Sequence, residues 1–267
     1  MSRLCAVLVA CMLGLALPPA ASGQAPREHF QLKIGPSYDE GDFGTSDTTR
    51  TFFLPLTLKY LGDRFDVGVT MSYVSIDSAG GVTIVDGRPV ETGEERGARR
   101  TDSGFGDIFL RGRYFLIDDP GPQSPLPALS PTLVLKIPTA DEDDSLGTGE
   151  PDFGFGLELD KTFGNLIVFG EVSYRIIGDP PGQDFRNRPA AYVGAGLRLS
   201  DLVTVIGLVD WRRALIAEND DPLELVGVVS LRLTPTILVS PNAFVGLTDG
   251  SPDFGIGVEL SYKFGRY

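Results

Sequence analysis

The stretch that decides the fold is Asp253–Phe264, with the sequence DFGIGVELSYKF. Apolar side chains occupy every second position from Phe254 to Phe264, while Glu259 and Lys263 fall between them. Successive side chains of a β-strand point to opposite faces, so a period of two is typical of a strand with one apolar and one polar face. We predict such a strand here.

The same alternation recurs through most of the chain. Together with Asp253–Phe264, the segments that carry it predict about twelve strands, an even number that suits an antiparallel up-and-down barrel. The other segments are His29–Pro36, Thr51–Leu61, Arg64–Ser75, Gly104–Ile117, Pro131–Pro138, Asp152–Lys161, Leu166–Ile177, Ala190–Leu199, Leu202–Arg213, Leu223–Leu233 and Thr236–Leu247.

The connections between these segments alternate in length. Bacterial outer-membrane barrels have short turns on the periplasmic side and longer loops outside. Asp118–Pro127 is longer, and Asp249–Pro252 shorter, than this alternation predicts. The short connections are Leu61–Arg64, Phe163–Asn165, Ser200–Asp201 and Thr234–Thr236. The segments predicted to be polar external loops are Tyr38–Thr48, Asp77–Ser103, Thr139–Glu150, Gly178–Asn187 and Ala214–Asp221.

Alternation alone does not separate a soluble barrel, with its apolar face inside, from a membrane barrel, with that face outside. Aromatic residues near the ends of the apolar stripes favour the membrane, because such residues form girdles at the two interfaces. We therefore predict an all-β transmembrane barrel. The aromatic residues are Phe52, Tyr60, Phe65, Tyr73, Tyr174, Trp211, Tyr262 and Phe264.

The first residues read as a secretory signal peptide. Arg3 precedes the apolar run Leu4–Leu17, which is followed by small residues. We place cleavage after Gly23, with neighbouring sites between residues 21 and 25 as alternatives, so residues 1–23 form the signal and 24–267 a single barrel domain. A competing reading takes Leu8–Cys11 as a lipoprotein cleavage site. Export and barrel pattern together predict the outer membrane of a Gram-negative bacterium.

Composition narrows the function classes. The net charge of −13 argues against a nucleic-acid partner, which needs a basic surface. Both cysteines, Cys5 and Cys11, lie in the predicted presequence, and His29 is the single histidine. These counts disfavour a zinc site or a histidine-dependent enzyme, and no cofactor or metal is predicted. The acidic run Asp141–Asp144 lacks the spacing of a calcium loop and reads as a solvated external loop.

The polar faces of the strands would line the lumen of a membrane barrel. Their charges nearly balance, which assigns the net acidity to the loops. We predict a passive channel or transporter for small solutes, with a closed barrel of structural or loop-binding role as the alternative. The candidate selectivity residues are Asp107, Arg111, Arg113, Arg175, Asp210 and Arg212. The remaining charged positions of these faces are Lys33, Lys59, Asp66, Lys136, Glu158, Asp160, Glu171, Arg198, Glu224, Arg232, Glu259 and Lys263.

Several short motifs carry a family resemblance. Gly104-Phe105-Gly106-Asp107 with Arg113-Tyr114 resembles the glycine–glycine–aspartate strand of outer-membrane transporters that are linked to the meta-pathway of phenol degradation. The resemblance runs from about Gly104 to the end of the chain. The other matching segments are Pro138–Asp141, Leu146–Gly149, Asp160–Gly164, Tyr174-Arg175, Gly178–Gly182, Asp210–Arg212, Asp249–Asp253 and Ser261–Phe264.

The resemblance implies a barrel that carries small solutes, with hydrophobic or aromatic compounds as candidates. It also implies contact with the barrel-assembly machinery, which reads a C-terminal aromatic residue. The membrane barrel itself predicts contact with outer-membrane lipid, and the many loop carboxylates predict bridges through divalent cations to lipopolysaccharide phosphates. Tyr262, Phe264 and Tyr267 are candidates for that signal. This sequence departs from the family pattern because Gly265-Arg266-Tyr267 extends past Phe264.

Overall fold

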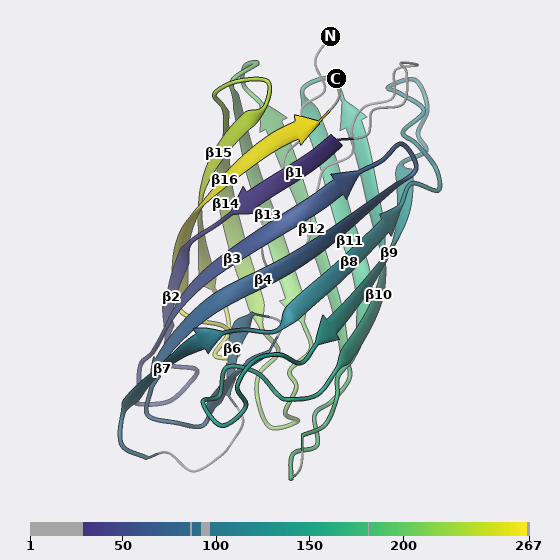
Figure 1. Ribbon diagram of the computed structural model, residues 1–267. Coiled ribbons are helices and arrows are strands. Elements are labelled where there is room, and N and C mark those ends of the chain that lie inside the picture. The colour runs from purple at the N-terminus through teal and green to yellow at the C-terminus, as the bar shows by residue number, and fades with distance from the viewer. Residues whose placement is uncertain (1–28, 86, 92–96, 181, 266–267) are drawn as a thin grey trace.

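The computed structural model describes residues 29–85, 87–91, 97–180 and 182–265. It is a closed antiparallel barrel, because β1 (His29–Ile34) pairs with β16 (Phe254–Gly265) on one side and with β3 (Thr49–Leu61) on the other (Figure 1). Closure gives each wall strand except β7 (Arg100–Phe105), which pairs with β4 alone among the described residues, a partner on both sides, as a bilayer requires of strands that cross it. Within the described residues, no helix is both long and apolar enough to span a membrane.

Twelve antiparallel segments make up the barrel wall, as predicted. Two of them are interrupted: β1 continues as β2, and β7 continues as β8. The neighbours in the sheet follow chain order around the barrel. The remaining wall elements are β2 (Ser37–Gly41), β4 (Phe65–Ser78), β7 (Arg100–Phe105), β8 (Ile108–Tyr114), β9 (Ala128–Ile137), β10 (Asp152–Phe163), β11 (Leu166–Ile176), β12 (Arg188–Arg198), β13 (Val203–Arg212), β14 (Leu223–Arg232) and β15 (Ile237–Gly246).

Two predicted boundaries were wrong. The first strand does not end at Pro36: it resumes as β2 and pairs with both β3 and β16, so the loop predicted from Tyr38 is shorter. Proline only removes one donor, and its carbonyl still accepts the Val258 N–H at 3.1 Å. The strand predicted over Gly104–Ile117 begins earlier, at Arg100, and is interrupted between Phe105 and Ile108.

The segment Asp77–Ser103 is not simply a polar external loop, and this prediction was also wrong. It contains a hairpin of β5 (Val82–Val85) and β6 (Arg88–Glu91). Val82 and Ile84 are buried in one cluster with inward-facing residues of β3 and β4 and with Leu146. The hairpin therefore folds into the mouth of the barrel. The sequence signal is a β-branched run followed by Asp-Gly, a common hairpin turn.

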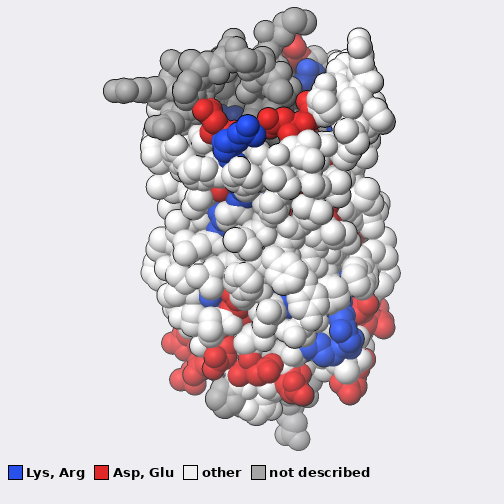
Figure 2. Space-filling view, turned by 90° about the vertical axis from the view of Figure 1, so that its right-hand side faces the viewer, with Lys and Arg blue, Asp and Glu red and all other residues white. Residues whose placement is uncertain are grey.

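The direction of the two strand faces decides between a membrane and a soluble barrel. Met71 is 48% exposed, Val172 57% and Ile256 56%, whereas Lys136 and Glu224 are 0% exposed. Apolar side chains thus point outward and charged ones point inward, which is stable only in lipid. Figure 2 shows charged side chains gathered toward the two ends of the barrel, with a broad, mainly uncharged band between them.

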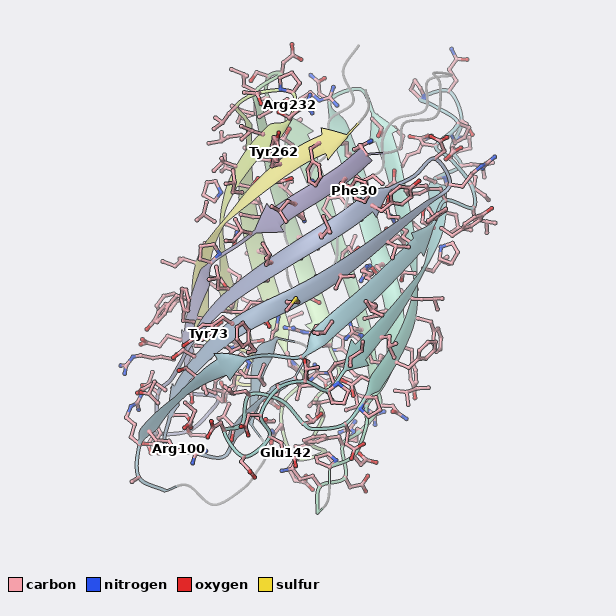
Figure 3. The ribbon with its side chains drawn as sticks, in the orientation of Figure 1. Phe30, Tyr73, Arg100, Glu142, Arg232 and Tyr262 are labelled. Carbon is pink, nitrogen blue, oxygen red and sulfur yellow. The ribbon has the colours of Figure 1, made fainter. Side chains whose placement is uncertain are left out.

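Outward aromatic residues form a girdle at each end of this band. Near the start of β1, the ring of Phe30 lies 5.6 Å from that of Tyr60 and 5.8 Å from that of Phe264. Toward the opposite end, Tyr73 and Phe105 pack edge to face at 6.2 Å. Figure 3 shows Phe30 and Tyr262 at one end and Tyr73 toward the other. The predicted girdles are confirmed, and the fold is that of an outer-membrane barrel.

The end of the barrel where β1 starts and β16 finishes carries the short turns, and the long connections lie at the opposite end (Figure 1). By the usual arrangement of such barrels, the first end is periplasmic and the second extracellular.

The connection between β8 and β9 is the one long connection described at the periplasmic end. Its Asp119 accepts a hydrogen bond from Lys161 of β10. Burial raises the pKa of Asp119, but hydrogen bonds from Lys161 and two backbone amides hold it below its ordinary value. The predicted signal peptide and Tyr267 lie outside the described residues.

Candidate solute pathway

A chain of buried ion pairs covers one side of the lumen. Arg113 contacts Asp66 of β4 at 2.5 Å and Glu158 of β10 at 2.9 Å. Arg111 reaches the same Glu158 at 3.1 Å and Glu171 of β11 at 2.7 Å. Strand register explains this arrangement. Glu158 and Glu171 are direct cross-strand partners, so their like charges would repel without a shared cation. The predicted residues Arg111 and Arg113 therefore hold the inner wall together.

Asp107 differs from the other predicted residues because it binds the backbone of an external loop. It is 6% exposed at the break between β7 and β8, and its Oδ1 accepts the backbone N–H groups of Thr139 at 3.0 Å and Ala140 at 3.1 Å. Lys136 lies 3.6 Å from the same carboxylate and 2.9 Å from that of Asp152. Asp107 thus fixes the start of the external loop after β9, and this explains why an aspartate stands beside that break.

Arg175 and Asp210 meet Arg111 around a small cavity of about 30 Å³ on the β10–β13 side of the barrel. Asp210 is 1% exposed, and neither of its oxygens has a hydrogen-bond partner among the described residues. Its nearest cation is Arg212, whose Nε lies 3.9 Å away. The structure therefore brings together Arg111, Arg175 and Asp210, which lie far apart in the sequence.

The neighbouring part of the lumen, on β11 to β15, carries a cluster of inward apolar side chains, which the sequence analysis missed. On β13, Ile206 and Leu208 point inward and are 5% and 3% exposed. Their outward neighbours are also apolar, so alternation alone does not distinguish the inward face of this strand from its outward face. The apolar doublets Val205-Ile206 and Leu208-Val209 were the available signal of an apolar inward face. We call this surface the apolar wall. Its buried members are Ile167, Phe169, Tyr192, Ile206, Leu208, Val226 and Val228, with Leu238 and Phe244 packed against them.

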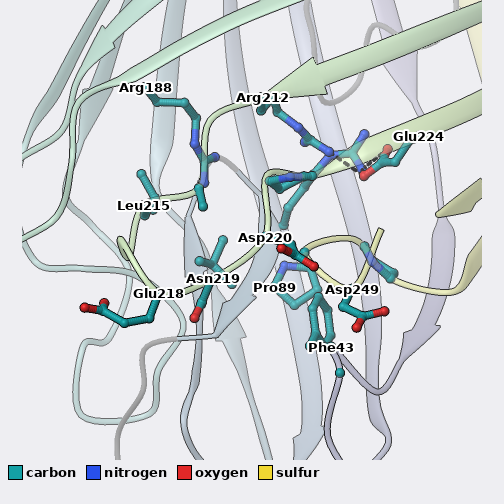
Figure 4. Close-up of a pocket in the computed structure, with 17 residues that line it drawn as sticks. Phe43, Pro89, Arg188, Arg212, Leu215, Glu218, Asn219, Asp220, Glu224 and Asp249 are labelled. Atoms are coloured by element: carbon teal, nitrogen blue, oxygen red, sulfur yellow. Dashed lines mark hydrogen bonds and ion pairs between the residues drawn. The ribbon is translucent and has the colours of Figure 1, made fainter. Parts of the chain in front are cut away.

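The hairpin reaches this wall through Arg88. Its Nη1 donates to both carboxylate oxygens of Glu224, at 2.6 and 2.5 Å, and its guanidinium lies 5.4 Å from the ring centroid of Phe244. Arg212 Nη2 donates to the same carboxylate. Figure 4 shows Arg212 and Glu224 joined at the floor of a cavity, with Asp220 and Asp249 lying further from that floor.

This cavity, which we call the vestibule, has a volume of about 220 Å³. It lies on the extracellular side, between β6, the β2–β3 connection and the external connections after β13 and β15. Arg88, Arg188 and Arg212 line it and are 6%, 3% and 6% exposed. The predicted Arg212 is therefore part of this site. Arg88, which binds the same Glu224, lies in the segment that was predicted to be a loop.

The remaining predicted positions lie elsewhere in the barrel and its loops. Lys33 pairs with Glu259 at 3.1 Å, both of them buried. His29 is half-buried at the first position of β1, opposite Gly265. In the acidic run, the Asp143 N–H donates to the Asp141 carboxylate, which makes it a local turn. Arg198, Arg232 and Lys263 are half-buried near the periplasmic end.

The model of a family described as "Putative MetA-pathway of phenol degradation" matches residues 38–264, well over half of the chain. Among solved structures, an outer membrane channel from Pseudomonas putida F1 is 13% identical, with 93% of this chain and 100% of that chain covered and a TM-score of 0.67. The NanC porin is 11% identical, with 87% and 100% covered and a TM-score of 0.54. The KdgM porin in complex with oligogalacturonate is 6% identical, with 89% and 99% covered and a TM-score of 0.52. At these identities the likenesses establish the barrel fold.

Proposed function

This chain belongs to the family described as "Putative MetA-pathway of phenol degradation", and from that premise we propose that it is a passive outer-membrane channel for small solutes with an apolar or aromatic part. One observation carries the proposal: a cluster of inward apolar side chains on β11 to β15 lies beside a charged part of the lumen. A barrel whose interior serves only a structural role could be filled by ion pairs on all sides, without such an apolar surface.

The vestibule adjoins the apolar wall, and we infer that solutes pass from the one to the other. Phe244 packs against the apolar wall and also lies under Arg88, which lines the vestibule. A solute entering from outside would meet Arg88, Arg212 and Glu224 first, and the apolar side chains of β13 and β14 next. An apolar surface beside polar groups suits molecules that have both characters. The route therefore favours small amphipathic solutes over sugars or ions.

The hairpin acts as a fixed constriction in this proposal, rather than as a lid. Val82, Ile84 and Val85 are each at most 5% exposed. Burial of such side chains stabilises by about 1.5–3 kcal/mol each, so withdrawal of all three would cost about 5–9 kcal/mol before the Arg88–Glu224 contact is counted. A state of that energy is populated in fewer than roughly one molecule in a thousand. The hairpin should stay in place while solutes pass it.

The test is single-channel conductance of the refolded protein in a planar bilayer, beside a variant in which residues 80–97 are replaced by a short Gly-Ser link. We expect small discrete steps for the wild type and several-fold larger steps for the variant. The double variant Arg111→Ala, Arg175→Ala should conduct with altered ion selectivity. Arg64→Ala, at an exposed position in the turn after β3, is the matched control and should behave as wild type. Silent bilayers for all four folded proteins would reject the channel.

One observation favours a second candidate, a closed barrel whose external loops bind other molecules. The charged side of the lumen is filled by its own ion pairs, with Arg113, Glu158 and Glu171 at 6–7% exposed. Shortening the Thr139–Glu150 loop separates the two: a loop-binding barrel would lose its ligand, while a channel would still conduct. Conduction only after hairpin removal would also support the closed barrel.

Further parts of the proposal concern residues and partners. Arg111, Arg113, Arg175, Asp210 and Arg212 would set selectivity by charge, Asp107 would act through the loop it anchors, and no covalent chemistry is involved. The outward Tyr262 and Phe264 of β16, together with Tyr267, would serve the barrel-assembly machinery. External carboxylates would bridge to lipopolysaccharide phosphates through divalent cations, which sensitivity of the protein's extraction to chelators would test.

A further inference from the structure

The long periplasmic connection between β8 and β9, residues 118–127, begins on the lipid-facing side of the wall. Ile117, directly before it, forms a β-bridge with Leu129, and Leu129 pairs with Leu159 of β10. Leu159 is 37% exposed on the outward face of its strand. Cross-strand partners lie on the same face of a sheet, so Ile117, which is 46% exposed, belongs to the outward face as well.

Lys161 of β10 shows where the connection goes. It pairs with Val168, which is 38% exposed, so Lys161 also lies on the outward face, yet it is only 6% exposed. Its Nζ donates to Asp119 Oδ1 at 2.5 Å and to the Gly121 carbonyl at 2.7 Å. The Thr162 N–H donates to the other Asp119 oxygen at 3.1 Å, beyond the point where β10 pairs with β9. The connection therefore covers the outer side of β10 and neutralises its outward lysine.

Two outward aromatic residues give the depth of the connection in the membrane. Tyr114 of β8 is 48% exposed and lies opposite Phe65, whose ring packs against Tyr60 of the periplasmic girdle at 5.7 Å. Phe163 of β10, two residues after Lys161, is 50% exposed. The connection runs between these two strands, and girdle aromatics lie at the level of the lipid headgroups. It is therefore level with the periplasmic headgroups.

The backbone of the connection suits this place of low polarity. A backbone donor without a partner is costly in lipid, and proline has no N–H to satisfy. The Ser124 N–H donates to the Gly121 carbonyl, and the Leu126 N–H to the Ser124 hydroxyl, each at 3.2 Å. Asp119 also accepts the Gly121 N–H at 2.9 Å. Four of the ten residues are prolines, namely Pro120, Pro122, Pro125 and Pro127.

Exposed apolar side chains flank and occupy the connection: Leu116 is 53% and Leu126 62% exposed. Through Ile117 they are continuous with the lipid-facing surface of β8 and β9. From these features we propose that residues 118–127 are a membrane anchor that binds phospholipid of the periplasmic leaflet. Leu126 inserts among the lipids, and the Asp119–Lys161 contact holds the connection against the wall. This anchor works in the same way whether or not the lumen conducts.

The test is spin-label accessibility in vesicles of phosphatidylethanolamine and phosphatidylglycerol. Cys5 and Cys11 both lie in the predicted signal peptide, so one cysteine introduced into residues 24–267 carries a unique label. Oxygen concentrates in lipid and a nickel chelate in water, so the ratio of the two accessibilities reports depth. Val172→Cys on the lipid-facing wall and Asp220→Cys on an external loop are the references.

We expect the ratio for Leu126→Cys to lie closer to that of the lipid-facing label than to that of the loop label. A label at Leu126 that is as accessible to the nickel chelate as the one at Asp220 would overturn the proposal. The exposed apolar side chains of the connection would then be free for a periplasmic protein.

Asp119→Asn tests the contact that holds the connection, and Asp118→Asn, at the exposed neighbouring position, is the matched control. Loss of one charge-assisted hydrogen bond should raise the detached fraction about tenfold, seen as a higher nickel accessibility of the Leu126 label. Asp118→Asn should leave that label unchanged. The Val172 label, measured in both variants, shows whether the wall itself is intact.

An unchanged Leu126 label in Asp119→Asn, with the wall intact, would reject the role of Asp119. An equal rise in both variants would show that the charge of the connection matters and its contact with Lys161 does not, which would also reject it.

Discussion

The two sides of the lumen fill the interior of the barrel with different kinds of side chain. On the charged side, strands β4, β8, β10 and β11 fill the interior with ion pairs; on the other, β11 to β14 fill it with apolar side chains. Paired charges depend on every partner, because removal of one leaves another buried and uncompensated. Apolar packing loses only the contacts of the side chain that is removed. The two sides should therefore respond differently to substitution. In the proposed channel, solutes pass along the apolar side because movement there breaks no ion pair.

The largest effect is expected at Glu158. It accepts from Arg111 at 3.1 Å and from Arg113 at 2.9 Å, so Glu158→Ala leaves the buried Arg113 and the half-buried Arg111 without this partner. We expect the free energy of unfolding to fall by about 3–5 kcal/mol. Guanidinium titration of the barrel in lipid vesicles, followed by the fluorescence of Trp211, measures it.

Asp201→Ala, at an exposed position in the turn between β12 and β13, is the control and should stay within about 0.5 kcal/mol of wild type. A loss below about 1 kcal/mol for Glu158→Ala would show that water reaches and screens the two arginines. The charged side would then be a wet pore wall, and the contrast between the two sides would lose its energetic basis.

A smaller loss is expected on the apolar wall. Leu208 is 3% exposed, and it packs with Phe169 over Gly194, where an added Cβ would come within 2.6 and 2.8 Å of these two side chains. Leu208→Ala should cost about 2–3 kcal/mol, the lower part of the range for buried leucine, and should raise conductance by widening the route. The same titration and the bilayer recording measure both.

Leu225→Ala is the matched substitution on the lipid-facing side, where the leucine is 48% exposed, and it should cost less and leave conductance unchanged. If both variants lower the free energy of unfolding by the same amount, Leu208 does not belong to a packed apolar wall. Unchanged conductance in Leu208→Ala, with the stability loss present, would place the solute route away from β13.

The strands and their outward faces could be predicted from the sequence, because contact with lipid requires apolar side chains on those faces. Every strand that crosses a bilayer must present apolar residues at alternate positions, so Phe254–Phe264 and the similar segments could be recognised as strands from the sequence alone. The inner half obeys no such rule. Glu158 and Glu171 are neighbours only through register, and Arg88 meets Glu224 across 136 positions of sequence.

The apolar wall and the hairpin were missed for related reasons. On β13 and β14 apolar residues stand on both faces, so Ile206 and Val226 were indistinguishable from lipid-facing neighbours. The hairpin lies in a segment whose ends are polar, and its Val82–Val85 run was overlooked between them. Arg111, Arg113, Arg175 and Asp210 lie on the inward face, whereas their predicted role in selectivity stays a prediction.

The smallest effect is expected at Tyr192, which stands where the two sides meet. Its ring packs against Phe169 at 6.3 Å, and its hydroxyl donates to Glu171 at 3.3 Å. Tyr192→Phe keeps the ring and removes the hydrogen bond, and Glu171 retains Arg111 and Thr132. We expect a loss of about 0.5 kcal/mol, the lower end for one hydrogen bond, because the contact is long.

Double-mutant cycles assign Tyr192 to one side. If the apolar wall holds it, the full truncation Tyr192→Ala should couple strongly with Phe169→Ala and weakly with Glu171→Gln, since coupling energies report direct contacts. Strong coupling with Glu171 alone would make Tyr192 the last member of the ion-pair chain, and the apolar wall would then be interrupted at β12. In that case, a solute passing β12 would lie beside charge rather than beside an aromatic ring.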